Sequence, residues 1–187
     1  MSRLENVELA GLRLGMNINQ VINILPKIET MPLGEFGDLL ATFMPSHDQP
    51  NDSSFAHIYQ IHIQFMLEQA VEIQVDYIDT LHQWENSVDK FSSHLAKAQG
   101  FPDEWQYKEA PEYLNKTHQD EHIRIEIETK FLKSSNDRSW ASSIVYKVSL
   151  TAYKKMEEVY IQHRQIVQAR NEKKKLEEEK LKKNFKF

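Results

Sequence analysis

The chain has 187 residues, a formal net charge of -5 and a mean hydropathy of -0.61, and 40% of its residues are hydrophobic. This length and apolar share suit one domain, with or without an appendage. No apolar run approaches the roughly 18 to 20 residues that a membrane-spanning helix needs. The sequence contains no cysteine, which excludes disulfides, thiolate metal sites and cysteine nucleophiles and leaves the redox compartment open.

Charge divides the chain into two parts. The segment from Lys154 onward holds 11 Lys/Arg and 6 Asp/Glu, a net of +5, whereas residues 1–153 hold 12 and 22, a net of -10. We therefore expect an acidic α+β domain over residues 1–153 and a basic helical extension over residues 154–187. The start of the chain has no apolar signal region, so the sequence as written predicts a cytoplasmic protein, or a periplasmic one if a leader was removed.

The first predicted elements are a strand, a turn and a short helix. Residues 7–14 have extended apolar character, and Gly15 allows the backbone to turn. Asn17 is a suitable N-cap for a helix whose apolar positions recur at helical spacing and which ends at Pro26. A turn-rich connection over residues 32–37, a strand over residues 38–44 and a polar loop over residues 45–54 follow.

The middle of the chain alternates between apolar and polar residues. In residues 57–67, Ile61 and Ile63 face one way while His62 and Gln64 face the other, and residues 71–77 alternate in the same manner. Two alternating runs with a short link at residues 68–70 predict an antiparallel pair with one solvated face.

A second helix is predicted after Trp84, capped by Asn86 or Ser87 and ended by Gly100. A polar stretch then leads to Glu121. Residues 123–131 alternate strictly, and residues 140–150 return as a strand after a turn, which predicts a further antiparallel hairpin.

The predicted order is β-α-β-β-β-α-β-β followed by a long C-terminal charged helix. This order indicates the α+β class, with a mostly antiparallel sheet and two short helices packed on one face. The last helix begins near Thr151 with an apolar stripe that includes Met156 and Tyr160. From about Arg170 it depends on Glu and Lys pairs at i,i+4, which stabilise a helix in solvent.

The residues Gly15, Met16, Asn17, Gln20 and Val21 form a turn-and-helix motif. This motif resembles the entry of small bacterial envelope domains of the SmpA/OmlA and beta-lactamase-inhibitor-protein-like type, in which antiparallel strands follow. The resemblance covers about the first 80 residues and implies a non-enzymatic domain that binds other proteins as a scaffold or inhibitor. The departures are the absence of a leader and of a lipobox cysteine, and the added basic helix.

Histidine offers the only plausible ligand set for a metal. In His118-Gln-Asp-Glu-His122, both histidines would share one face of a helix, with Asp120 beside them. The segment lacks the glutamate of the HExxH pattern and runs straight into a strand, so we expect a solvated loop and no metal or other cofactor. The sequence also contains no nucleophile elbow and no phosphate-binding glycine loop.

We therefore expect a non-catalytic protein-binding or scaffold module, which the envelope-domain resemblance associates with the cell envelope. The alternative is a small metal-dependent or general acid/base enzyme that uses His118, His122 and nearby carboxylates. The partner is another protein or a second copy of the chain bound through the C-terminal helix, and interleaved glutamates argue against nucleic acid. The expected partner-binding residues lie in this helix and are Arg170, Lys173, Lys174, Lys175, Phe185 and Phe187.

Overall fold

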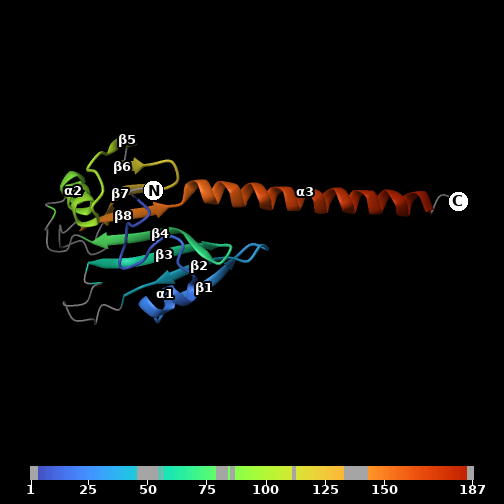
Figure 1. Cartoon of the computed structure of the whole chain (residues 1–187), viewed down its shortest axis with the longest axis horizontal. Helices are drawn as coiled ribbons and strands as arrows, with labels where there is room; N and C mark the ends of the chain where they lie inside the picture. Colours follow the sequence, from blue (N-terminus) through green and yellow to red (C-terminus); the bar gives the residue numbers. More distant parts are fainter. Residues whose placement is uncertain are drawn as a thin grey trace.

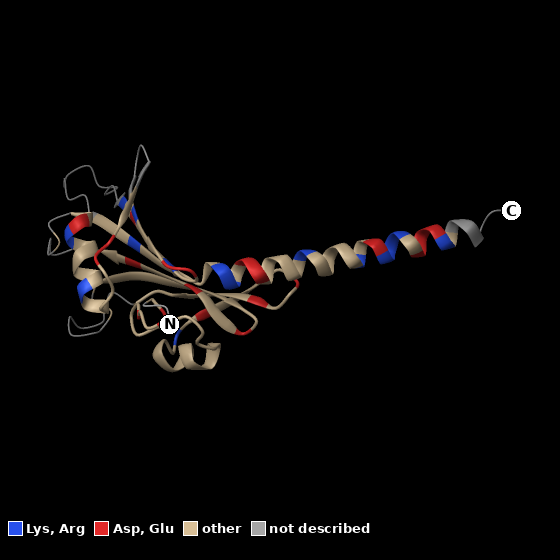
Figure 2. Cartoon of the chain, turned by 45° about the horizontal axis from the view of Figure 1, so that its top comes forward, with Lys and Arg blue, Asp and Glu red and all other residues tan. Residues whose placement is uncertain are grey.

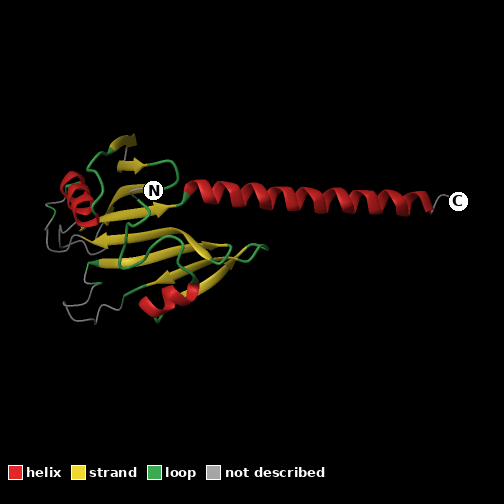
Figure 3. Ribbon diagram, in the orientation of Figure 1, coloured by secondary structure: helices red, strands yellow, loops and turns green. Residues whose placement is uncertain are grey.

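A computed structural model describes residues 4–45, 55, 57–78, 84, 87–110, 113–132 and 143–184. Within these ranges the chain forms eight strands and three helices (Figures 1 and 3). In chain order they are α1 (Ile18–Ile24), β1 (Glu29–Leu33), β2 (Asp38–Phe43), β3 (Ile58–Met66), β4 (Gln69–Ile78), α2 (Val88–Gln99), β5 (Gln106–Ala110), β6 (Tyr113–Gln119), β7 (Arg124–Leu132), β8 (Ser143–Thr151) and α3 (Tyr153–Asn184).

The described strands form one antiparallel sheet in the order β1-β2-β3-β4-β8-β7-β6-β5. The chain thus runs twice through a helix followed by four consecutive antiparallel strands. The last strands of the two halves, β4 and β8, pair in the middle of the sheet (Figure 1). The α+β class, the antiparallel sheet and the long C-terminal helix are confirmed.

Both short helices contribute to one hydrophobic core on the same face of the sheet. Val21 of α1 and Phe91 of α2 belong to the same buried cluster as Ile63, Ile73 and Ile127 of the sheet. Under α2, the Phe91 ring stacks on Tyr146 of β8 with centroids 4.3 Å apart. We refer below to this covered side as the core face and to the opposite side as the open face.

The predicted first strand is wrong. Ala10 and Gly11 both have positive φ, at 54° and 78°, so residues 7–14 fold back on themselves, and Leu9 and Leu12 bond each other rather than the sheet. Leu9 and Leu12 are fully buried, so this segment packs on the core face as an irregular loop. The observed order is therefore α-β-β-β-β-α-β-β-β-β-α rather than the predicted one.

The predicted cap of α1 is confirmed. Asn17 accepts a hydrogen bond from the backbone N–H of Gln20, and the Gln20 side chain accepts one from the backbone N–H of Asn17. The helix ends at Ile24, before Pro26. Hydrogen bonds between Gly15 and Ala70 and between Ala70 and Met16 then join this motif to the start of β4.

The hairpin between β3 and β4 turns one residue earlier than predicted. Leu67 and Glu68 form the turn, with φ values of 49° and 63°. Two-residue hairpins of this kind favour Asn-Gly, because positive φ is unfavourable for leucine and glutamate. We expect the double change Leu67→Asn and Glu68→Gly to raise the free energy of unfolding by about 1 kcal/mol.

Urea denaturation of the two proteins measures this difference. The matched control is Glu5→Gly, because Glu5 is also exposed and its change leaves the hairpin intact. An unchanged or lower stability of the hairpin variant would show that the two residues are not held in this turn conformation.

Candidate functional site

The open face of the sheet is mostly polar. In a strand, successive side chains point to opposite faces, so the neighbours of the core-face residues lie here. The central row crosses seven strands in register and contains Thr42, His62, Gln74, Ser149, Glu126, Thr117 and Gln106. Its flanking rows are Gln60, Asp76, Lys147, Glu128 and Asn115 on one side, and Leu40, Gln64, Glu72, Thr151, Arg124 and Gln119 on the other.

Many of these side chains hold each other in fixed positions. Asp76 is only 6% exposed because it accepts hydrogen bonds from the side chains of Gln60, at 2.7 Å, and Gln74, at 3.3 Å. Thr42 Oγ1 lies 3.1 Å from His62 Nδ1 on the neighbouring strand. These hydrogen bonds therefore hold the side chains of this region in fixed positions.

Charges of both signs are paired in the other half of the open face. Lys147 Nζ lies 3.1 Å from Glu128, and an Arg124 nitrogen lies 3.7 Å from Glu126. Burial raises the pKa of Glu72, and Lys147 partly offsets this effect. The three rows contain two cationic and four acidic side chains, so the open face carries charges of both signs and is mildly acidic.

The base of α3 closes one end of the open face. Val159 and Met156 pack on Met66 and Val71, which form a small second core cluster. The Tyr153 hydroxyl donates to the backbone oxygen of Asp120 at 2.9 Å. Helix α3 thus begins on the side opposite α1 and α2, and its far end extends beyond the sheet (Figures 1 and 2).

The hairpin of β1 and β2 lies against the next turns of α3. Between them is a hollow of about 990 Å³. It is lined by Phe36 and Asp38 from the hairpin and by Tyr160, His163 and Val167 from the helix. These residues keep the first half of α3 in contact with the sheet, although the sequence pattern gave no partner for its apolar stripe.

The expected partner-binding residues of α3 have different environments. Arg170 pairs with Glu35 of the hairpin at 2.9 Å, and Lys175 borders the hollow. Lys173 and Lys174 are exposed and belong to a run of three lysines that is followed by a run of three glutamates. Figure 2 shows such bands of opposite charge along the far part of α3. Phe185 and Phe187 lie outside the described residues. No described helix has the length and apolar character of a membrane span.

The structure separates the histidines of the candidate metal site. His118 lies within β6, not in the expected loop, and its Nδ1 lies 2.6 Å from the backbone oxygen of Glu104. His122 lies in the following turn with an exposed side chain, and Asp120 Oδ1 accepts from the backbone N–H groups of His122 and Ile123. Within the described residues, no group of three or more His, Asp or Glu side chains is placed to hold a metal ion.

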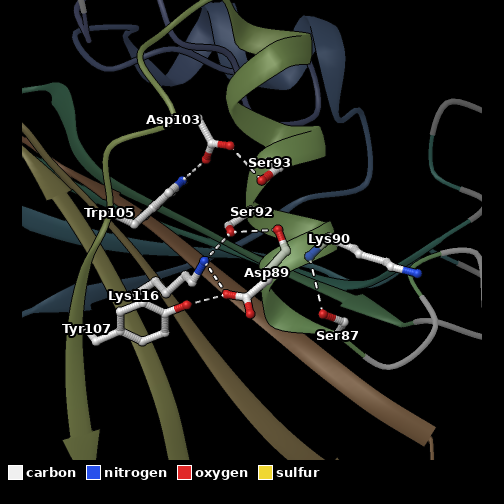
Figure 4. Close-up of polar contacts among 9 residues, drawn as sticks. All are labelled: Ser87, Asp89, Lys90, Ser92, Ser93, Asp103, Trp105, Tyr107 and Lys116. Atoms are coloured by element: carbon white, nitrogen blue, oxygen red, sulfur yellow. Dashed lines mark hydrogen bonds and ion pairs between the residues drawn. The ribbon is translucent and has the colours of Figure 1, made fainter.

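A buried lysine lies between α2 and the outer strands, a feature that the sequence did not indicate. Lys116 is 5% exposed, and its Nζ lies 2.8 Å from Ser92 Oγ and 2.5 Å from Asp89 (Figure 4). A serine beside a lysine is one arrangement of a nucleophile and its base. Ser92 is fully buried and donates to the backbone oxygen of Asp89, so the pair joins α2 to β6 and is closed to a substrate.

The Asp89 carboxylate gives this contact a pH dependence. Hydrogen bonds from Lys116 and then from Tyr107 lower the pKa of Asp89. A lowered pKa stabilises the folded state at neutral pH, and this contribution is lost as the pH falls through the folded-state pKa. We expect Asp89→Asn to reduce the melting temperature at neutral pH and to make no difference once aspartate is protonated.

Thermal melts from neutral to acidic pH check this expectation. Asp103→Asn is the matched control, because Asp103 also accepts side-chain hydrogen bonds but has no lysine partner among the described contacts. A constant offset between Asp89→Asn and the parent protein at every pH would contradict the assignment.

The geometry alone has to indicate the role of this site, because comparison with known proteins found no matching family model, no matching curated protein and no matching solved structure. The resemblance to bacterial envelope domains stays a prediction that rests on the motif from Gly15 to Val21. The open face and the base of α3 are the two surface features that the fold sets apart.

Proposed function

We propose that this chain is a non-catalytic protein-binding module that recognises its partner through the open face of the sheet. The observation that carries the proposal is the set of three polar rows across the sheet, whose side chains are ordered by one another. Helix α3 begins at the rim of this face and extends the surface in the direction of the strands (Figure 1).

The size of the open face suits a protein partner. The seven strands of the central row, spaced about 4.8 Å apart, span roughly 29 Å, and three rows of residues span about 20 Å along the strands. The resulting area of about 600 Å² is comparable with the roughly 800 Å² that each partner contributes to a standard protein interface. A small-molecule substrate would instead need a concave, mostly apolar pocket.

The fixed side chains favour binding for an energetic reason. Ordering a flexible side chain on association costs about 0.5–1.5 kcal/mol. The hydrogen bonds of Asp76 with Gln60 and Gln74, and the ion pair of Lys147 with Glu128, reduce this cost before the partner arrives. They also present donors and acceptors at defined positions, which gives specificity.

The charge of the chain makes a protein a better candidate than a nucleic acid. Residues 1–153 have a net charge of -10, which repels phosphate groups. The basic residues of α3 are interleaved with glutamates (Figure 2). The open face, which carries charges of both signs, instead suits the mixed polar surface of another protein.

The experiment that tests the proposal is site-directed photocrosslinking of the full chain in an extract of the source cells. A benzophenone amino acid replaces Ser149 at the centre of the open face or Gln74 beside it. The matched control places it at Ala98, an exposed residue of α2 on the opposite side. We expect one crosslinked protein from both open-face positions and none from Ala98. A partner crosslinked from Ala98 but from neither open-face position would contradict the proposal.

A further inference from the structure

The far part of α3, residues 172–181, extends beyond the sheet (Figures 1 and 2). Every one of these residues is exposed, and the side chains of Leu176 and Leu181 are each 57% exposed. This part of the helix therefore presents a surface that a second chain can reach.

The charges around Leu176 follow a symmetrical order. Glu172 is followed by three lysines, and after Leu176 three glutamates are followed by Lys180. Each residue at a given distance before Leu176 thus has the opposite charge to the residue at the same distance after it. A second copy of this segment that runs in the opposite direction would place opposite charges together, whereas a parallel copy in register would place like charges together.

The charged residues that matter most lie on the same side of the helix as Leu176. Residues three and four positions apart are neighbours on a helix surface, and here they are Glu172, Lys173, Glu179 and Lys180. Val167, which lines the hollow beside the hairpin, precedes Leu176 by about two and a half turns and points to the opposite side. Of the four charged residues, only Glu172 also borders the hollow. A second helix can therefore lie along Leu176 without displacing the β1–β2 hairpin.

These charges are available to a second chain. Among the described side chains, none of the four charged neighbours of Leu176 forms an ion pair. Glu172 accepts a hydrogen bond from the neutral Gln168, one turn earlier in the same helix, at 3.0 Å.

We propose that two copies of this chain associate through the far part of α3, with the two helices antiparallel and Leu176 of one copy against Leu176 of the other. In this register Glu172 faces Lys180 of the second copy, and Lys173 faces Glu179. The two-fold symmetry repeats both pairs. Each exposed ion pair contributes little alone, but charged pairs beside a helix–helix contact determine which orientation of the partner is favoured.

The antiparallel direction also separates the two acidic domains. Leu176 lies about 35 Å along the helix from Tyr153, the first residue of α3, so the two copies of Tyr153 would lie about 70 Å apart. A parallel pair would instead place two domains with a net charge of -10 side by side. This inference does not depend on the proposed function, and its tests use the purified chain alone, so the failure of one proposal leaves the other intact.

Disulfide crosslinking tests the register, because the chain contains no cysteine of its own. We expect Leu176→Cys to form a covalent dimer on mild oxidation much faster than Ala98→Cys, an exposed control position on α2. Glu172→Cys alone is expected to react no faster than Ala98→Cys, because its two thiols would lie about 12 Å apart along the helices. A mixture of Glu172→Cys and Lys180→Cys is expected to form the mixed dimer. Equal rates for Leu176→Cys and Ala98→Cys, or rapid crosslinking of Glu172→Cys alone, would overturn the proposal.

Sedimentation equilibrium at low salt tests the charge pairs. Lys173→Glu places a carboxylate opposite Glu179 of the second copy, so we expect the dimer to weaken by roughly tenfold or more. Adding Glu179→Lys to the same chain restores opposite charges across the antiparallel contact and is expected to restore the dimer. The matched control Lys174→Glu makes the same change in charge on the opposite side of the helix and is expected to associate like the parent protein. A parent protein that stays monomeric at millimolar concentration, or a double variant as weak as Lys173→Glu, would contradict the antiparallel pair.

Discussion

Replacing Ile125 with lysine is expected to remove a large part of the free energy of unfolding. Ile125 is fully buried in β7, where it is in register with Leu150 of β8 and His118 of β6. A lysine there would place an unpaired charge in the core, at a cost of about 3–5 kcal/mol. This cost is comparable with the roughly 5–15 kcal/mol that stabilises a typical domain. Urea denaturation followed by circular dichroism measures the loss.

The next residue provides the matched control. Glu126 lies on the open face of the same strand, so Glu126→Lys adds a lysine without burying it. We expect its unfolding free energy to stay within about 1 kcal/mol of the parent protein. If Ile125→Lys melted like the parent, or if both variants lost equal stability, the assignment of the two faces of β7 would be wrong.

The second large effect is expected for Phe91→Ala in α2. Phe91 is 3% exposed, stacks on Tyr146 and contacts Trp84 edge-on with centroids 4.8 Å apart. Removing a buried phenylalanine ring leaves a cavity and costs about 3–5 kcal/mol. The loss is measured as a lower urea midpoint with an unchanged slope.

Lys97→Ala tests whether the effect belongs to the ring rather than to the helix. Lys97 lies on the exposed side of α2, and lysine and alanine have similar helix propensities. We expect no more than about 0.5 kcal/mol from this change. A loss of less than about 1 kcal/mol for Phe91→Ala would show that α2 does not pack on the core face as described.

The elements that the sequence predicted well carry a periodic pattern of their own. Alternation in β3, β4 and β7 matches their observed faces, and His62 and Gln64 lie on the solvated side as predicted. The caps of α2 are also confirmed, because Ser87 accepts a hydrogen bond from Lys90 N–H and Gly100 adopts a left-handed conformation. Local chemistry is sufficient to specify these elements.

The elements that were missed have no such pattern. Strand β1 is almost entirely exposed and contains Pro32, which suits only an edge strand. In β6 the positions that face the core are held by Lys116 and His118, so no apolar alternation marks this strand. In both cases the strand pairs with a neighbouring strand, and no local periodic pattern in the sequence marks it.

The candidate site could be predicted even less well from the sequence, because it forms only when distant strands pair. Alternation in β3, β4 and β7 indicated one polar side for each of these strands, but the three rows exist only because β4 pairs with β8. The contact between Asp38 and His163 joins distant parts of the chain, and nothing near either residue in the sequence marks it. The aromatic stack of Phe36 on His163 arises only when the hairpin meets the helix.

The central claim is that the open face binds a partner protein, and the most direct test is the affinity of the crosslinked partner for three purified chains. These are the parent protein, Ser149→Trp on the open face and Ala98→Trp on α2, each with an unchanged melting temperature. We expect Ser149→Trp to weaken binding at least tenfold, about 1.4 kcal/mol, and Ala98→Trp to bind like the parent. Equal affinity of Ser149→Trp and the parent protein would contradict the claim.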